Sequence, residues 1–211
     1  MSLALDTNQS FVSTARDVNT TRTYTMRARA DSVERTRTQI LEAAFSLGEE
    51  RLTFAIGLAD VAERAGVTVR TVLRHFGSRE GLFDALTDFA RQRISEEREA
   101  PVGDSRAAVR IIVAHYEQRG DFVMRSLEQE SVDERIAAQV EKGRRMHRGW
   151  VRTVFAPQLE RAEDAKALED LLVVATDIYT WKLLRRDAGH SRARTEERMY
   201  TLISRLVGKE D

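Results

Sequence analysis

The residues in this sequence best suited to chemistry are arginines and threonines gathered in one short segment, 68–79. The segment contains no Asp or Glu, and its candidate side chains are those of Thr68, Arg70, Thr71, Arg74, His75 and Arg79. Guanidinium groups can bond guanine edges in pairs or reach phosphates, and threonine hydroxyls can bond either partner. Acidic and basic residues balance over the whole chain, at 34 each. An acid-free cationic segment in such a chain favours a local contact with DNA.

Two short helices joined by a tight turn are expected to position these side chains. Over 58–65 apolar residues recur at helical spacing, and Gly66 can take the left-handed conformation that ends a helix. Thr68 then supplies a hydroxyl that caps a second helix over 69–76. The spacing of this second helix turns Val69, Val72, Leu73 and Phe76 inward and leaves Arg70, Thr71, Arg74 and His75 outward.

This segment resembles the DNA-reading head of TetR-family transcriptional regulators. The family pattern I-A-x-x-A-G-V-S-x-x-T-L-Y-x-H-F, followed by S-K-E, corresponds to residues 61–76 and 78–80 of this sequence. The agreement includes the small residues, the turn and the final aromatic residue. Leu73 departs from the pattern, because the family usually has a tyrosine there whose hydroxyl bonds a DNA phosphate. Gly57 stands where a capping threonine is usual, and Arg79 replaces a lysine while keeping its charge.

Helices on either side of this segment are expected to complete the head. A helix over 32–47 carries Ile40, Ala44 and Leu47 on one face and would make a three-helix unit, and a helix over 79–97, capped by Ser78, would leave it. Arg35 and Arg37 lie at the start of the first of these helices, where we expect them to reach the DNA backbone. Residues 1–31 lack apolar periodicity and predict a mobile arm. The head domain is therefore expected over 32–99.

The remainder of the chain predicts a helical bundle. Pro101 and Gly103 break the helical pattern and predict a domain boundary near 100–104. Beyond it, periodicity predicts helices over 105–119, ended by Gly120, and over 122–129, 132–156, 165–187 and 194–207. With only two prolines in the chain, the fold class is all-α. It comprises about nine helices, and the resemblance implies that 102–211 form a ligand-binding and dimerisation domain.

The last two predicted helices carry unusually apolar surfaces. A helix that is apolar all round, as over 165–187, is buried on more than one face. The resemblance implies that these two helices form a four-helix dimer interface, and the residues expected in it are Ile178, Trp181, Leu184, Arg185, Met199, Leu202, Ile203 and Leu206. The alternative is that both surfaces belong to the core of one subunit.

Other chemistry is poorly represented. The chain has no cysteine and four scattered histidines, none at metal-ligand spacing, and it has no phosphate-binding glycine loop. We therefore expect no catalytic residue, no metal and no cofactor. Helical bundles do bind small molecules between their helices, and the candidates for such a pocket are His115, Tyr116, Phe122, Met124, Met146, His147, Trp150 and Tyr179. For each of these residues the alternative is ordinary core packing.

The sequence thus predicts a regulator that binds double-stranded DNA. The resemblance implies a homodimer, with recognition helices about one helical turn apart, that represses from a palindromic operator and is released by an unidentified small-molecule effector. Arg70 and Thr71 are the residues expected to read bases. The alternatives are a helical ligand-binding or interaction protein with a degenerate DNA-reading head, and a small helical enzyme. Lacking an apolar leader or spanning segment, the protein is expected in the cytoplasm, away from membranes.

Overall fold

The secondary structure of the protein is helical throughout the residues that the structure describes. The structure is a computed structural model, and it describes residues 15–51 and 56–208, with side chains on the first helix from Arg29 onward. No strand occurs in these ranges, so the predicted all-α class is confirmed. Within them, no helix is long and apolar enough to cross a bilayer.

The chain divides into two compact units. The head unit comprises the described residues up to Ser46 together with Gly57–Ala85, and the bundle unit comprises Leu47–Ile56 and the chain from Leu86 onward. The helices α1 (Ala15–Glu50) and α4 (Arg79–Glu97) each run from one unit into the other without a break. The division therefore falls inside helices, ahead of the Pro-Gly segment near 100–104 that the sequence pattern favoured.

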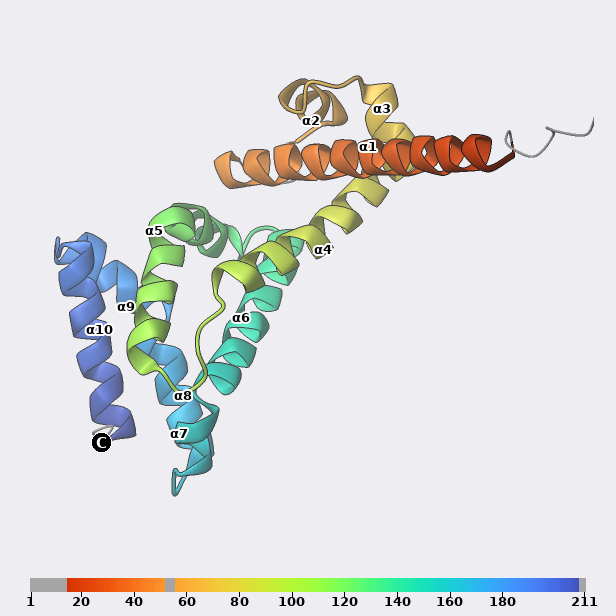
Figure 1. Cartoon of the computed structure of the whole chain (residues 1–211). Coiled ribbons are helices and arrows are strands. Elements are labelled where there is room, and N and C mark those ends of the chain that lie inside the picture. Colours follow the sequence, from red (N-terminus) through yellow and green to blue (C-terminus); the bar gives the residue numbers. More distant parts are fainter. Residues whose placement is uncertain (1–14, 52–55, 209–211) are drawn as a thin grey trace, which may run out of the picture. The chain divides into compact units, whose positions relative to one another are not determined.

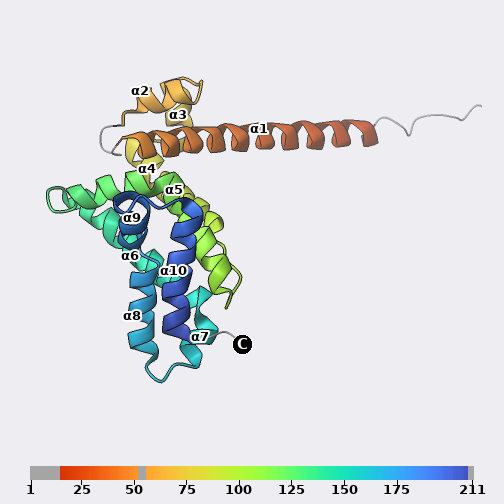
Figure 2. The same ribbon diagram turned by 90° about the vertical axis from the view of Figure 1, so that its left-hand side faces the viewer.

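The head unit is built from α1, α2 (Leu58–Arg64), α3 (Val69–Phe76) and the first turns of α4. Figures 1 and 2 both show α1 running alongside α2 and α3. The core of the head unit contains the fully buried side chains of Ile40, Ala44, Val61, Val72 and Leu82. The Gln39 side chain also donates to the Ala65 carbonyl over 2.7 Å, which fastens α1 to the end of α2.

The first helix is longer than its apolar pattern predicts. It begins at Ala15, so residues 15–31 are helical, although their sequence pattern predicted no helix. Hydrophobic periodicity detects helices that bury one face, and it is silent on a polar helical extension. The part of the predicted arm over 1–14 lies outside the described residues.

The bundle unit contains the remaining helices: α5 (Ser105–Gln129), α6 (Glu134–Val154), α7 (Ala156–Glu160), α8 (Ala165–Ala175), α9 (Ile178–Lys182) and α10 (Arg192–Val207), with a π-helical turn at Leu183–Asp187 after α9. Helix α5 packs against α6 and α10, and α8 packs against the same two helices (Figure 2). Their shared core includes Ile112, Phe155, Leu172, Trp181 and Met199. The bundle thus has an apolar core of its own.

Two predicted helix boundaries in the bundle are wrong. Gly120 does not end a helix, because α5 continues through it. The glycine there makes room for the Trp181 indole, since a Cβ at position 120 would lie 2.7 Å from ring carbons of Trp181. Conversely, the predicted helix over 165–187 is interrupted after Ala175, where Asp177 caps α9 by accepting a 2.9 Å hydrogen bond from the Tyr179 amide. Uniform apolarity concealed this break.

Candidate functional site

The turn between α2 and α3 has the compact geometry of a helix-turn-helix. Gly66 has a φ of 63°, and the Val67 amide bonds the Ala62 carbonyl over 2.9 Å, so the chain reverses directly after α2. Glycine suits this left-handed conformation because it lacks a Cβ. Thr68 then caps α3 by accepting from the Thr71 amide over 3.1 Å, and the two hydroxyls lie 3.0 Å apart. Both threonines are thereby fixed at the start of α3.

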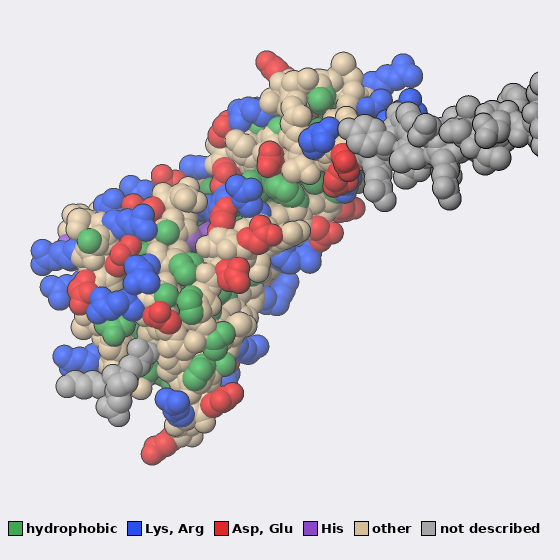
Figure 3. All heavy atoms as spheres, in the orientation of Figure 1, with side chains coloured by type: hydrophobic (Ala, Val, Ile, Leu, Met, Phe, Trp, Pro, Cys, Tyr) green, Lys and Arg blue, Asp and Glu red, His purple; other side chains and the backbone are tan. Residues whose placement is uncertain are grey.

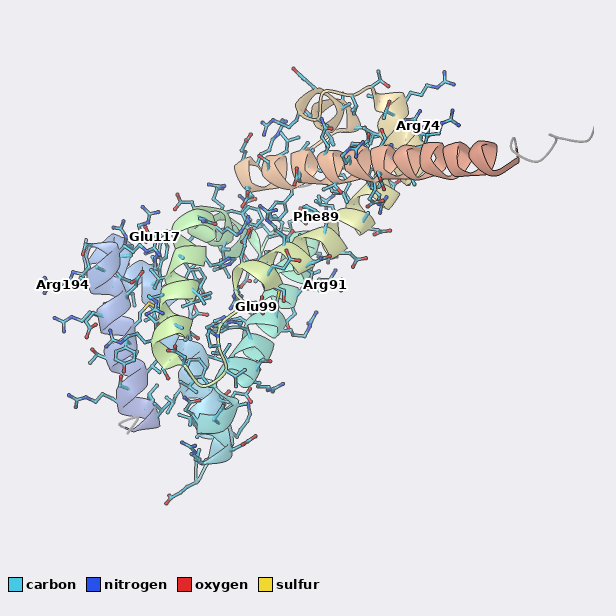
Figure 4. All side chains as sticks on the ribbon, in the orientation of Figure 1. Arg74, Phe89, Arg91, Glu99, Glu117 and Arg194 are labelled. Atoms are coloured by element: carbon cyan, nitrogen blue, oxygen red, sulfur yellow. The ribbon has the colours of Figure 1, made fainter. Side chains whose placement is uncertain are left out.

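Helix α3 presents two unengaged cations to solvent. Arg70 and Arg74 are exposed, and neither forms a hydrogen bond or ion pair with another described residue. Figure 4 shows Arg74 on α3, extending outward from the ribbon. An exposed guanidinium keeps its hydration and costs little to hold free, so both side chains are available to an incoming anion.

The buried face of α3 is narrower than predicted. Val72 is fully buried, with His75 and Phe76 half-buried on either side of it, whereas Val69 and Leu73 are 37% and 39% exposed. The prediction that Val69 and Leu73 turn inward is wrong, because a helix of two turns buries only the residues that face its neighbour directly. His75, predicted outward, lies beside that contact. Leu73 consequently places an apolar side chain on the surface where the family has its phosphate-binding tyrosine.

The His75 imidazole sits in positive surroundings. Burial, followed by the charges of Arg74 and Arg37, lowers its pKa below the ordinary value of 6.5. Its Nε2 is buried and has no hydrogen-bond partner among the described residues. At neutral pH the ring is therefore uncharged, and it contributes polarity rather than charge to the face of α3.

Two further arginines predicted to contact DNA are held over aromatic rings. The Arg37 guanidinium lies 4.6 Å from the centre of the Phe76 ring, and that of Arg79 lies 4.5 Å from the centre of the Phe83 ring. Such contacts hold a cation over the face of an aromatic ring. Arg35 is exposed on α1. All eight predicted DNA-contact residues accordingly belong to the head unit.

The entry into α4 is sterically tight. Gly77 has a φ of 77°, and the Ser78 hydroxyl caps α4 by accepting from the Gly81 amide over 3.0 Å. A Cβ at position 81 would lie 2.2 Å from the Phe76 carbonyl oxygen. Only glycine fits there, so the angle between α3 and α4 depends on a residue that the motif comparison did not single out.

The bundle unit brings together four of the predicted pocket residues around a buried arginine. The Nη2 of Arg98 lies 2.6 Å from His147 Nδ1, and its guanidinium carbon lies 5.0 Å from the centre of the Trp150 ring. The Trp150 indole donates to the Arg98 carbonyl over 2.7 Å and stacks on His147 at 5.8 Å. His115 and Tyr116 are buried beside one another, with ring centres 5.6 Å apart. We call Arg98, His115, Tyr116, His147, Trp150 and Thr176 the buried polar cluster.

The two histidines of this cluster are neutral. The pKa of each is lowered from 6.5 to about 3, mainly by burial and then by the charge of Arg98. In the described part of the chain, no group of three or more His, Asp or Glu side chains is arranged to hold a metal ion. The cluster therefore combines one cation with uncharged hydrogen-bonding groups.

The other predicted pocket residues lie apart from this cluster or add only apolar surface. Phe122, Met124 and Met146 are half-buried, and Met124 packs against the bundle core. Tyr179 is 51% exposed, because the break before α9 turns it to the surface. Sequence reasoning missed Arg98, which follows Glu96 and Glu97 and precedes Glu99 and therefore has the appearance of one charge in a solvated run.

Comparison with known proteins places the head geometry in a family. The family model described as "Bacterial regulatory proteins, tetR family" matches residues 40–86. The HTH-type transcriptional regulatory protein RaaS of Mycobacterium tuberculosis is 45% identical over 47 residues, which are 22% of this chain and 22% of RaaS. Residues 40–86 of this chain thus resemble the TetR family. The match to RaaS spans about a fifth of that relative's length.

Solved structures extend the likeness to the fold of most of the chain. A putative TetR-family regulator from Rhodococcus sp. has a TM-score of 0.56 at 19% identity, covering 82% of this chain and all of that one. A transcriptional regulator from Rhodococcus sp. Rha1 has a TM-score of 0.57 at 17% identity, covering 81% and 95%. A TetR-family regulator from Streptomyces coelicolor has a TM-score of 0.54 at 18% identity, covering 81% of each chain. At these identities the likeness establishes the fold.

Most residues predicted for a TetR-type dimer interface lie in the core of the bundle. Exposed fractions are 5% or less for Ile178, Trp181, Met199 and Ile203. Leu184 and Leu206 pack against the same core, and Arg185 pairs with Glu117 of α5 at 2.8 Å. Of the eight, Leu202 alone ranks among the exposed large hydrophobic residues, at 42%. The stripe on the last helix is thus mainly intramolecular.

The exposed apolar surface of the bundle is carried by different residues. The large hydrophobic side chains exposed on α8, α9, the π turn and α10 are Leu171, Val174, Tyr179, Leu183 and Leu202, at 49%, 61%, 51%, 62% and 42%. Figure 3 shows hydrophobic side chains on one face of the bundle, interspersed with basic and acidic ones. We call these five residues the outer apolar set.

Proposed function

We propose that the protein is a TetR-type regulator that binds double-stranded DNA through α3. The observation that carries this proposal is the acid-free, solvent-exposed face of α3, on which Arg70 and Arg74 have no partner among the described residues. Arginine at such a position can bond guanine O6 and N7 in pairs, and Thr71 can bond a phosphate or base. Arg35, Arg37 and Arg79 then contact the backbone, while Arg70 and Thr71 read bases.

The proposal includes a homodimer that reads a palindrome. A two-fold dimer presents two recognition helices about 34–36 Å apart, or one turn of DNA. The outer apolar set supplies a surface for dimerisation on α8 to α10, the part of the chain that the resemblance predicted, although most of the individual residues differ. Leu202 belongs to both sets.

The proposal also assigns the bundle unit the role of binding a small-molecule effector that releases the DNA, so that the protein acts as a repressor. The buried polar cluster supports this role, because ligand sites in proteins are mostly apolar and contain a few hydrogen-bonding groups. Helix α4 is continuous from Arg79 to Glu97 and Arg98 follows it directly. A hundredfold loss of operator affinity requires under about 3 kcal/mol of differential binding. The proposed role is binding without catalysis.

The experiment that tests the DNA-binding role is selection from a random pool of duplex DNA by the purified full-length protein, followed by sequencing. We expect recovery of a palindrome whose affinity falls steeply with salt, because released counterions drive phosphate contacts. Light scattering on the selected complex should give two chains per site. Recovery of no sequence, at either of two salt concentrations, would contradict the proposal.

A second candidate function is ligand binding or protein interaction by a chain whose head does not read DNA. The exposed Leu73 favours it, because a tyrosine hydroxyl for a phosphate is absent from that position. Under this alternative the selected pool stays random, and restoring the hydroxyl with Leu73→Tyr recovers no palindrome either. Selective binding by the unmodified chain would exclude it.

A further inference from the structure

The buried polar cluster contains a positive charge that no described residue neutralises. Arg98 is 5% exposed. No carboxylate among the described residues lies within ion-pair distance of its guanidinium, which contacts His147 and the Trp150 ring, and its Nε is buried without any hydrogen-bond partner. Arginine stays protonated in proteins, and buried charges are normally paired. Arg98 therefore lacks a counter-ion.

The neighbouring groups cannot supply the missing negative charge. Glu97, adjacent in sequence, is engaged by Arg119, which donates to its two oxygens over 2.8 and 2.6 Å and also pairs with Glu49. His115 and His147 are neutral, and the Tyr116 hydroxyl is protonated and donates to the Thr176 carbonyl over 3.1 Å. The nearby carboxylate is thus committed elsewhere, and the remaining groups are uncharged.

The hydrogen bonds of the cluster form a chain that starts at Arg98, in which each group donates to the next. The guanidinium can only donate, so His147 Nδ1 is the acceptor and the ring proton is on Nε2. That Nε2 donates to the Thr176 hydroxyl over 3.1 Å, and the hydroxyl donates to the Leu172 carbonyl over 2.7 Å. His147 and Thr176 are therefore satisfied. The groups left over are Arg98 Nε and His115 Nδ1, both buried without a hydrogen bond, with Glu97 Oε2 3.7 Å from His115 Nδ1.

We propose that the bundle unit binds a small apolar monocarboxylate, whose carboxylate bonds the free Nε edge of Arg98 beside His115. One unpaired guanidinium matches one negative charge, and its planar fork matches the two oxygens of a carboxylate. A phosphate dianion would add a surplus negative charge close to Glu97. The ligand body is apolar, because the cluster adjoins the hydrophobic core of the bundle: Tyr116 belongs to that core, and the Trp150 ring meets the core residue Phe155 edge-on at 6.2 Å. This inference rests on the proposed effector-binding role and specifies the chemical class of the effector.

The test measures thermal unfolding and calorimetric binding of the full-length protein with benzoate, octanoate, their uncharged amides, phosphate and chloride. We expect benzoate or octanoate to raise the Tm of the wild-type protein, and the corresponding amide to leave it unchanged. Arg98→Met should lose at least about 30-fold in affinity for that carboxylate, the loss typical when one partner of a buried charged pair is removed. Arg98→Lys should retain part of the affinity, because it keeps the charge without the fork.

Two controls keep the outcome interpretable. Arg110→Ala removes an exposed arginine of α5 and should bind the carboxylate as the wild type does. Without ligand, Arg98→Met should have an unchanged or higher Tm, because it removes an unpaired buried charge; a structural arginine would give a large loss. The inference is overturned if no carboxylate gives an Arg98-dependent shift, or if amide, phosphate or chloride shifts the Tm equally.

A DNA-release assay separates this inference from the proposed function. A carboxylate that binds through Arg98 without releasing the selected operator would support the ligand class and contradict the effector role. An uncharged compound that releases the operator, with no carboxylate binding at Arg98, would support the effector role and overturn the ligand class.

Discussion

The arginines of the head unit and the arginine of the buried polar cluster carry the same charge in opposite surroundings. Arg70 and Arg74 are exposed and hydrated, so their freedom costs little and favours any polyanion that fits their face. Arg98 is buried, so its charge is costly until one anion of the right shape arrives. The comparison teaches that exposure, rather than residue type, separates a surface suited to a polymer from a site suited to a small ligand.

The largest expected effect is a loss of stability when a buried side chain of the bundle unit is removed, compared with an exposed side chain of the head unit. Trp181→Ala should destabilise the protein by about 3–5 kcal/mol, because the indole is fully buried and packs against Tyr116. Leu73→Ala in the head should cost far less, because Leu73 is 39% exposed. Urea unfolding of both variants checks the contrast. A Trp181 variant of wild-type stability that dissociated into monomers would instead restore Trp181 to the dimer interface.

The next effect is the loss of folding stability at acid pH, which should be larger for the bundle unit than for the head unit. The pKa of His115 and of His147 is about 3 in the folded protein and 6.5 ordinarily. Between these values the unfolded chain binds more protons, so stability rises with pH and is lost as pH falls from about 6.5 towards 3. Each histidine should contribute a loss of up to about 2 kcal/mol between pH 7 and pH 5.

Urea unfolding at the two pH values measures this loss, and a matched variant assigns it. His147→Gln places a side-chain amide oxygen that can still accept from Arg98, but it cannot titrate, so it should remove about half of the pH dependence. An unchanged dependence in this variant would show that other groups cause the acid sensitivity.

A third prediction sharpens the role of the exposed arginines. Arg70→Ala should weaken binding to the selected operator by about 1–3 kcal/mol and relax selectivity at one or two base pairs. Arg110→Ala, an exposed arginine of the bundle, should leave binding unchanged. Binding titrations on operator variants decide the matter, since an equal weakening on every sequence would mean that Arg70 contacts phosphate alone.

The last two effects, which include the smallest, come from two glycines within bundle helices. Gly120→Ala should destabilise the protein by about 1–3 kcal/mol, because its Cβ would meet the Trp181 ring at 2.7 Å. Gly143→Ala should stabilise it by about 0.4–1 kcal/mol, because nothing lies within 4 Å of a Cβ in the middle of α6. Thermal unfolding of the two variants should therefore show shifts of opposite sign, and shifts of the same sign would exclude the steric explanation.

The sequence predicted the head more accurately than the bundle, for physical reasons. The helix-turn-helix depends on residues a few positions apart, such as Gly66 and the cap at Thr68, and local spacing reveals these. The bundle depends on pairs far apart in the chain, such as Gly120 with Trp181 and Arg98 with His147. Gly120 therefore had the appearance of a helix end and Arg98 that of a solvated charge, since tertiary packing decides both.

Exposure within the head was also only partly predictable. Periodicity assigned Val69 and Leu73 to the inner face of α3, whereas the short helix buries Val72 alone completely. The predicted dimer residues had the opposite problem, because helical spacing marks an apolar face without saying whether the face meets its own subunit or another. Trp181 and Met199 meet their own.

The fit of Trp181 against Gly120 also bears on how this protein can diverge. A larger residue at 120 fits only once the residue at 181 has become smaller. If the residue at 181 becomes smaller first, it leaves a void, and a single later change at 120 need not fill that void. The two positions are therefore expected to vary together among descendants of this chain. Drift in the bundle would proceed by paired replacements, through intermediates of lowered stability.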